Sequence, residues 1–167
     1  MKQKFIDLYM NLAHDVSQMS TAVKLKVGTV IVKDHIITYG YNGTPSGWDN
    51  NCEDRDWDMG AGPYLTSEEF DARYPYEGWH VGAERVIRYG LKTKPETLHS
   101  EANALMEIAK STISSEGATL FCTHAPCIDC AKMIYQAGIF SVYYRNEYRS
   151  TDGINFLEKS GITIQKA

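Results

Sequence analysis

The stretch HSEANALMEIAKSTISSEGATLFCTHAPCIDC, residues 99–130, decides how the rest of the chain is interpreted. EANALMEIAK (101–110) has the apolar spacing of a helix, and ATLFCT (118–123) is typical of a buried strand. A second helix is expected to begin near Cys127. A helix, a strand and a helix in this order predict that the two helix starts lie next to each other in space.

The flanking segments extend this alternation in both directions. Residues 2–18 place apolar side chains along one helical stripe, and two strand-like runs joined by a tight turn at 33–35 predict a hairpin. After residue 130 come a strand, a helix and a short strand. The runs are VGTVIV (27–32), IITYGY (36–41), SVYYR (141–145), INFLEKS (154–160) and ITIQ (162–165). This order predicts an α/β fold, a three-layer α/β/α sandwich around a central mixed five-stranded sheet.

Residues 44–98 interrupt the pattern with an irregular segment that contains Trp48, Trp57 and Trp79. Short helices are expected near 67–74 and 82–89. We interpret the segment as an insertion within a single domain spanning 1–167, not as a second domain with its own core.

The composition narrows the classes of partner. The 167 residues carry a formal net charge of -4, which argues against a nucleic-acid polymer as the main partner. No apolar run approaches the length of a membrane span, and the N-terminus does not resemble a signal peptide, so a cytosolic location, or the cytosol of a host cell, is expected. Four cysteines are too few and too unevenly spaced for a secreted disulfide scaffold.

Cys127 and Cys130 lie three residues apart at a helix start, so their sulfurs are expected to face the same way. With His99 they make three protein ligands, the number that a catalytic zinc uses when it keeps its fourth position for water. Glu101, two residues after the histidine, is placed to move protons beside that water. The combined spacing of H-x-E and P-C-x-x-C is the signature of zinc deaminases, so one zinc ion per chain is expected.

At these residues the chain resembles the cytidine deaminase superfamily, and within it the deoxycytidylate (dCMP) deaminases of viruses and cells. The resemblance covers nearly the whole chain and includes KVGTVIV (26–32), GYNGTPSG (40–47) and the spacing of Tyr143 and Tyr148 ahead of Asp152-Gly153. It implies hydrolysis of dCMP to dUMP, with a metal-activated water attacking C4 of the base and Glu101 as proton shuttle.

The resemblance also implies roles for other residues. Asn42 would bind the sugar hydroxyl, Tyr148 would lie by the base or sugar, and the 5′ phosphate would be surrounded by Ser20, Lys24 and Lys26. Ala125 would also belong to the substrate-binding residues. It further implies a homo-oligomer, a hexamer, with dCTP as activator and dTTP as inhibitor near Tyr41, Gly43 and Gly47. A Mg²⁺ ion would accompany such a triphosphate effector.

The chain departs from the family pattern at three places. Ser100 stands where the family commonly has alanine, and Ala125 lacks the hydroxyl often found before the proline. The segment SQMSTAVKLK (17–26) has no cysteine for a second, structural zinc. Of the remaining cysteines, Cys122 is expected in the core and Cys52 at the surface.

Several alternatives stay open at this stage. The substrate could be dCTP, a 5-substituted deoxycytidine nucleotide or a free nucleoside, and a base-modifying deaminase of RNA or DNA is disfavoured by the charge. A different class of function is a non-catalytic, zinc-stapled module that senses deoxynucleotides. A thiol oxidoreductase would instead cycle Cys127 and Cys130 as a disulfide.

Overall fold

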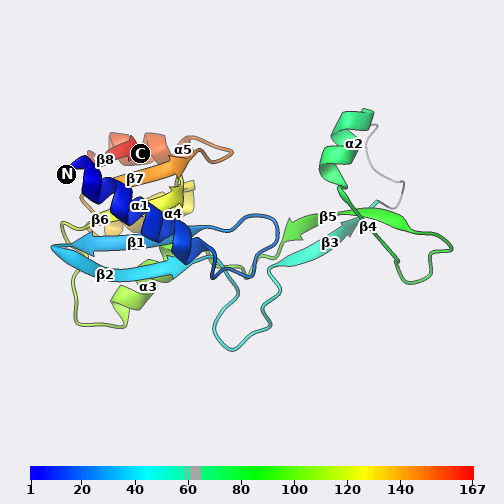
Figure 1. The fold of residues 1–167 in the computed structure, drawn as a ribbon, viewed down its shortest axis with the longest axis horizontal. Helices are drawn as coiled ribbons and strands as arrows, with labels where there is room; N and C mark the ends of the chain where they lie inside the picture. The colour runs from blue at the N-terminus through cyan, green and yellow to red at the C-terminus, as the bar shows by residue number, and fades with distance from the viewer. Residues whose placement is uncertain (59, 61–64) are drawn as a thin grey trace.

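The structure, a computed structural model, describes residues 1–58, 60 and 65–167. The body of the molecule is built on a five-stranded sheet in the order β2-β1-β6-β7-β8 (Figure 1). Strand β1 runs antiparallel to β2 and β6, whereas β6, β7 and β8 are parallel. The strands span Gly28–Lys33 (β1), His35–Tyr41 (β2), Thr119–His124 (β6), Ser141–Asn146 (β7) and Thr163–Lys166 (β8). The predicted mixed sheet of five strands is therefore confirmed.

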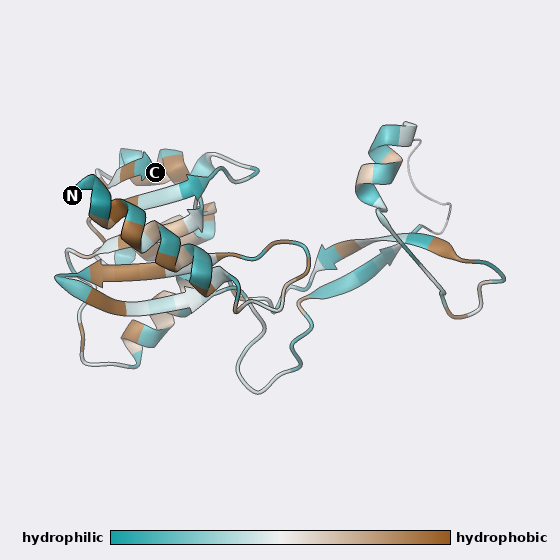
Figure 2. Ribbon diagram, viewed as in Figure 1, coloured by the Kyte–Doolittle hydropathy of each residue, from teal (hydrophilic) through white to brown (hydrophobic). Residues whose placement is uncertain are grey.

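Helices cover both faces of this sheet, and successive side chains along each strand point to opposite faces. Val30 and Phe121 pack under α1 (Gln3–Ser17). Their neighbours Ile31 and Leu120 pack under the helices of the other face, α3 (Ser100–Ala109), α4 (Ile128–Gln136) and α5 (Asp152–Lys159). Figure 2 shows β1 largely in the apolar colour, and α1 with apolar and hydrophilic residues alternating along its length. The predicted three-layer sandwich follows from this two-sided burial.

The N-terminal hairpin forms as the sequence predicts. Asp34 turns the chain between β1 and β2 with φ 61°, a left-handed conformation that a short polar side chain tolerates. The pairing then runs from Lys33 opposite His35 to Gly28 opposite Tyr41. This register places the end of β2 beside the loop that leads into the insertion.

The insertion projects from the body as an extended arm (Figure 1). We use "the arm" for the described residues between 44 and 97. Its strands β3 (Glu53–Trp57), β4 (Tyr76–Gly78) and β5 (Ile87–Thr93) form a second, antiparallel sheet in the order β3-β5-β4, accompanied by α2 (Ser67–Arg73). Its base is closed by Gly43 and Leu98, which exchange hydrogen bonds of 3.1 and 2.8 Å. The two buried apolar clusters of the body draw no residue from the described part of the arm.

Two expectations for the insertion are wrong and one is confirmed. The helix near 67–74 is confirmed as α2, whose N-cap Thr66 forms a capping box with Glu69. The helix near 82–89 does not form, because Gly82 adopts φ +85° and the chain from Ile87 joins β5, where it pairs with β3 and β4. Cys52, expected at the surface, is fully buried where its carbonyl accepts hydrogen bonds from Lys94 and Thr97.

No helix among the residues that the structure describes is long and apolar enough to cross a membrane.

Candidate active site

Three potential metal ligands meet where α3 and α4 begin. His99 is the N-cap of α3, Cys127 is the N-cap of α4, and Cys130 lies in the first turn of α4. His99 Nδ1 lies 3.5 Å from Cys127 Sγ and 3.4 Å from Cys130 Sγ. Around a tetrahedral zinc, bond lengths of about 2.0 Å to nitrogen and 2.3 Å to sulfur separate the ligand atoms by roughly 3.6 Å. All three ligand atoms lie within 4.8 Å of one another, so the group has the spacing to hold one zinc ion.

The electrostatics of the two thiols also suit a cation. The hydrogen bond with Cys130 lowers the pKa of Cys127 to about 4, and the same contact raises the pKa of Cys130. The pKa of His99 is raised mainly by its hydrogen bond to Cys127. Of two neighbouring thiols, only one loses its proton readily, because two thiolates at this separation repel each other. A divalent cation stabilises both thiolates, so both thiols can then be deprotonated.

Glu101 lies in the first turn of α3 and lines the same cavity as His99 and Cys127. Its side chain is 4% exposed, and burial raises the pKa of its carboxyl group. Ser100 Oγ donates a hydrogen bond of 3.0 Å to Glu101 Oε2. A carboxyl group that is shielded from water and has a raised pKa is suited to accepting and returning a proton near neutral pH.

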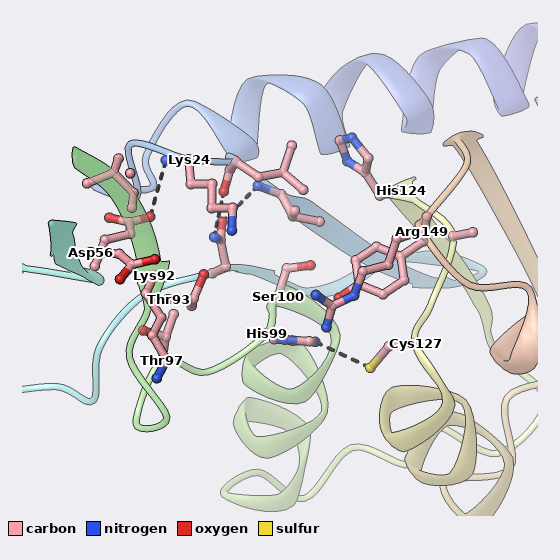
Figure 3. A pocket seen from close by; sticks show the side chains of 18 of the residues that line it. Lys24, Asp56, Lys92, Thr93, Thr97, His99, Ser100, His124, Cys127 and Arg149 are labelled. Carbon is pink, nitrogen blue, oxygen red and sulfur yellow. Dashed lines mark hydrogen bonds between the residues drawn. The ribbon is translucent and has the colours of Figure 1, made fainter. Parts of the chain in front are cut away.

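A cavity of about 980 Å³ opens over these residues, between the body and the arm. Figure 3 shows His99 and Cys127 at one side of it, with Lys24, Asp56 and Lys92 at the other. Of the residues predicted to bind substrate, the cavity brings Asn42, Lys24, Ala125 and Tyr148 to the same space as His99 and Glu101. The size and mixed lining suit a nucleotide-sized ligand.

Other residues from the sequence interpretation do not line this cavity. Ser20 is buried, and its Oγ donates to the carbonyl of Asn42 at 2.7 Å. Lys26 is exposed outside the cavity. Tyr41, Gly43 and Gly47 lie at the base of the arm and outside the cavity lining. Cys130 is buried behind Cys127.

The side-chain amide of Asn42 forms two hydrogen bonds with the backbone of the preceding loop. Its Oδ1 accepts from the Val27 N–H at 2.7 Å, and its Nδ2 donates to the Leu25 carbonyl at 2.8 Å. Glu53 at the start of β3 accepts from the N–H groups of Val23 and Lys24 at 3.3 and 3.2 Å. Asn42 and Glu53 therefore fix the segment that carries Lys24 from two sides.

Sequence reasoning missed Arg149 and Glu53, which both line the cavity. The Arg149 side chain reaches toward His99 in Figure 3, and its charge acts to lower the pKa of His99. The loop that carries Arg149 is tied down by Asn146, whose carbonyl accepts from the Ala125 N–H and whose Nδ2 donates to the Thr123 carbonyl. Arg149 directly follows Tyr148, a predicted substrate-binding residue, and this position could have identified it. No sequence pattern pointed to Glu53 as a residue of the site.

Comparisons with known proteins agree with this geometry. Residues 3–146 match the cytidine and deoxycytidylate deaminase zinc-binding region. The chain is 34% identical over 152 residues to the deoxycytidylate deaminase of Enterobacteria phage T4, covering 83% of this chain and 76% of that protein. It is 31% identical over 160 residues to ComE operon protein 2 of Bacillus subtilis, covering 95% and 68%.

Among solved structures, the chain is similar to the dCMP deaminase of cyanophage S-TIM5 in complex with dCMP and dUMP. The TM-score is 0.75 with 39% identity, and the match covers 100% of this chain and 99% of that one. The matched region includes the helix starts that bring His99, Glu101 and Cys127 together. The chain belongs to the zinc-binding cytidine and deoxycytidylate deaminase family.

Proposed function

We propose that the protein catalyses the hydrolytic deamination of dCMP to dUMP. The observation that carries this proposal is the meeting of a three-ligand zinc site and the buried Glu101 in one nucleotide-sized cavity. The full-length similarity to a cyanophage dCMP deaminase in complex with dCMP and dUMP supports dCMP as the substrate.

Within this proposal His99, Cys127 and Cys130 hold one zinc ion per chain. When bound, zinc lowers the pKa of a coordinated water molecule to about 7. Glu101 is placed to accept a proton from the attacking water and to deliver it to the ring nitrogen of the base. A further proton passed through Glu101 to the leaving amine releases ammonia, so that dCMP and water become dUMP and ammonia.

The other cavity residues bind and orient the nucleotide. Lys24 and Arg149 supply positive charge for the 5′ phosphate, and Tyr148 lies by the base or sugar. Asn42 contributes its second amide hydrogen to the sugar hydroxyl, since its other polar positions hold the backbone at Leu25 and Val27. Outside the cavity, Ser20 donates to the Asn42 carbonyl, and Lys26 adds positive charge to the segment that carries Lys24.

The proposal extends to assembly and regulation. A homo-oligomer, a hexamer by resemblance, is supported by the apolar side chains that the arm exposes, Trp48 at 60%, Trp79 at 67% and Val81 at 95%. We propose that dCTP and dTTP act as effectors near Tyr41, Gly43 and Gly47, with Mg²⁺ accompanying the triphosphate. We also propose a single deaminase domain over 1–167, with 44–98 as an insertion, that works in the cytosol.

A panel of substrates tests the reaction. Ammonia release is measured for the zinc-loaded protein on dCMP, dCTP, a 5-substituted dCMP, deoxycytidine and a short single-stranded DNA. We expect the highest kcat/KM on dCMP. Deamination of the DNA strand alone would overturn the substrate assignment, and zinc and nucleotide binding without ammonia release from any member would favour a sensing module.

A further inference from the structure

A row of buried polar side chains lies directly behind the Glu101 carboxylate. Ser100 Oγ, which donates to Glu101 Oε2, lies 2.8 Å from Thr29 Oγ1. Cys122 Sγ flanks both hydroxyls, 3.2 Å from the threonine oxygen and 3.8 Å from the serine oxygen. Thr29, Ser100 and Cys122 are all 0% exposed, so no bulk water competes for these contacts.

The sheet and the helix bring these groups together. Thr29 in β1 and Cys122 in β6 are paired opposite each other across the antiparallel ladder. Both alternate with residues that face α1, so their side chains point to the other face, where Ser100 begins α3. The contact therefore joins the rigid centre of the sheet to the residue next to Glu101.

The number of protons on these groups determines which group donates each hydrogen bond and which accepts it. A hydroxyl has one proton to donate, and Ser100 gives its proton to Glu101. The Ser100 oxygen is then an acceptor, for the Thr29 hydroxyl at 2.8 Å and more weakly for the Cys122 thiol at 3.8 Å. Thr29 has a choice between this oxygen and the sulfur of Cys122, and oxygen is the stronger acceptor. Thr29 thus orients the serine hydroxyl so that its proton points at the carboxylate.

We infer that Thr29 and Ser100 form a positioning pair that fixes the orientation of the Glu101 carboxylate. The inference rests on the proposed deaminase function, in which one oxygen of Glu101 must face the substrate. By holding Oε2 from behind, the pair leaves the other oxygen for proton transfer. The alanine that is common at position 100 in the family cannot make this contact, so the pair is an addition that tunes the rate.

Kinetics of three variants test the pair. Ser100→Ala is expected to lower kcat about threefold to tenfold, as for the loss of one hydrogen bond. KM for dCMP and the zinc content of one per chain should stay as in the wild type. Thr29→Val keeps the shape and removes the hydroxyl, so kcat should fall with little change in Tm. Thr29→Ser should keep kcat within about twofold of the wild type while lowering Tm, because it retains the hydroxyl but leaves a small cavity.

A second hydroxyl pair in the same sheet gives a matched control. Thr119 and Ser141, at the starts of β6 and β7, share a hydrogen bond of 2.9 Å and do not line the cavity. Thr119→Val and Ser141→Ala remove a partly buried contact of similar length and should leave kcat unchanged. Equal losses of kcat in the two sets of variants would overturn the inference, because they would show a general effect of losing a hydrogen bond between hydroxyl groups in this sheet.

A crystal structure of the zinc-loaded Ser100→Ala variant separates this inference from the proposed function. We expect the Glu101 carboxylate to turn away from the orientation that it has in the wild-type protein. An unchanged orientation, or a kcat for Ser100→Ala within twofold of the wild type, would overturn the positioning role. A wild-type protein that deaminates no deoxycytidine nucleotide would overturn the proposed function, while the structure still decides whether Ser100 positions Glu101.

Discussion

Gly153, in the first turn of α5, packs directly against the main chain of Cys127. A Cβ atom added to Gly153 would lie 2.9 Å from both the carbonyl carbon and the carbonyl oxygen of Cys127 and still closer to the oxygen of Pro126. Backbone atoms cannot move aside as a flexible side chain can. The absence of a side chain at Gly153 therefore allows α5 to support the start of α4, where two of the three potential zinc ligands lie.

Gly153→Ala is therefore expected to displace the start of α4. The free energy of unfolding should fall by about 1–3 kcal/mol, the usual cost of overpacking, and zinc should dissociate more readily. Urea denaturation and competition with a zinc chelator measure the two effects. Gly43→Ala is the control for stability, since nothing lies within 4 Å of its added Cβ. An equal loss of stability in both variants would contradict this reading.

Glu101→Gln is expected to lower kcat by about 10²- to 10⁴-fold, because the amide keeps the shape of the side chain but cannot shuttle protons. Zinc content and the affinity for dUMP should remain close to those of the wild type. Steady-state kinetics, metal analysis and calorimetric titration with dUMP check these outcomes. A variant that retains more than a tenth of the wild-type kcat would exclude Glu101 as the proton shuttle.

Zinc should be present at one ion per chain, and its removal should both abolish turnover and lower Tm. A ligand that binds the folded chain stabilises it by RT ln(1 + [L]/Kd), and a chelator removes this contribution. Cys130→Ala should lose the ion. Cys52→Ala is the matched control and should retain it, because Cys52 lies in the arm, outside the group of His99, Cys127 and Cys130. Zinc that is absent from freshly purified protein, with Cys127 and Cys130 forming a reversible disulfide, would instead indicate a thiol oxidoreductase.

Arg149→Ala is expected to raise KM for dCMP about 10- to 100-fold, the range for losing a hydrogen bond to a charged group. KM for deoxycytidine, which has no phosphate, should change little, and the ratio of the two KM values is the measurement. Arg145→Ala serves as the control, because Arg145 pairs with Asn11 of α1 at 3.0 Å and does not line the cavity. If deoxycytidine loses as much affinity as dCMP, Arg149 does not bind the phosphate.

Glu53→Ala is expected to raise KM for dCMP about threefold to tenfold, because two backbone N–H groups beside Lys24 lose their acceptor. The adjacent Asp54 is exposed, so Asp54→Ala offers a matched loss of charge without the loss of these bonds. The difference between the two KM values reports on the contact alone. Identical KM values for the two variants would show that the arm does not position Lys24.

Local sequence patterns were enough to predict the body of the fold and the group of potential metal ligands. The spacing of apolar residues predicts the strands of the five-stranded sheet and the helices that cover it. His99 and Glu101 precede one strand and Cys127 and Cys130 follow it, which brings them to adjacent helix starts. These are local patterns, readable over a few turns of chain. They sufficed because each motif lies at the end of a regular element.

Features that depend on contacts between distant segments could not be predicted from the sequence. Residues 82–89 look helical alone, but residues 87–89 enter β5, because pairing with β3 and β4 supplies the hydrogen bonds that the backbone needs. Cys52 and Glu53 lie in a polar stretch of the sequence, yet both are buried. The Cys52 carbonyl accepts a hydrogen bond from the Lys94 N–H, and the Glu53 carboxylate accepts one from the Lys24 N–H. The contact between Thr29 and Ser100 spans 71 residues, and no local pattern encodes a hydrogen bond whose two partners meet only when β1 packs against α3.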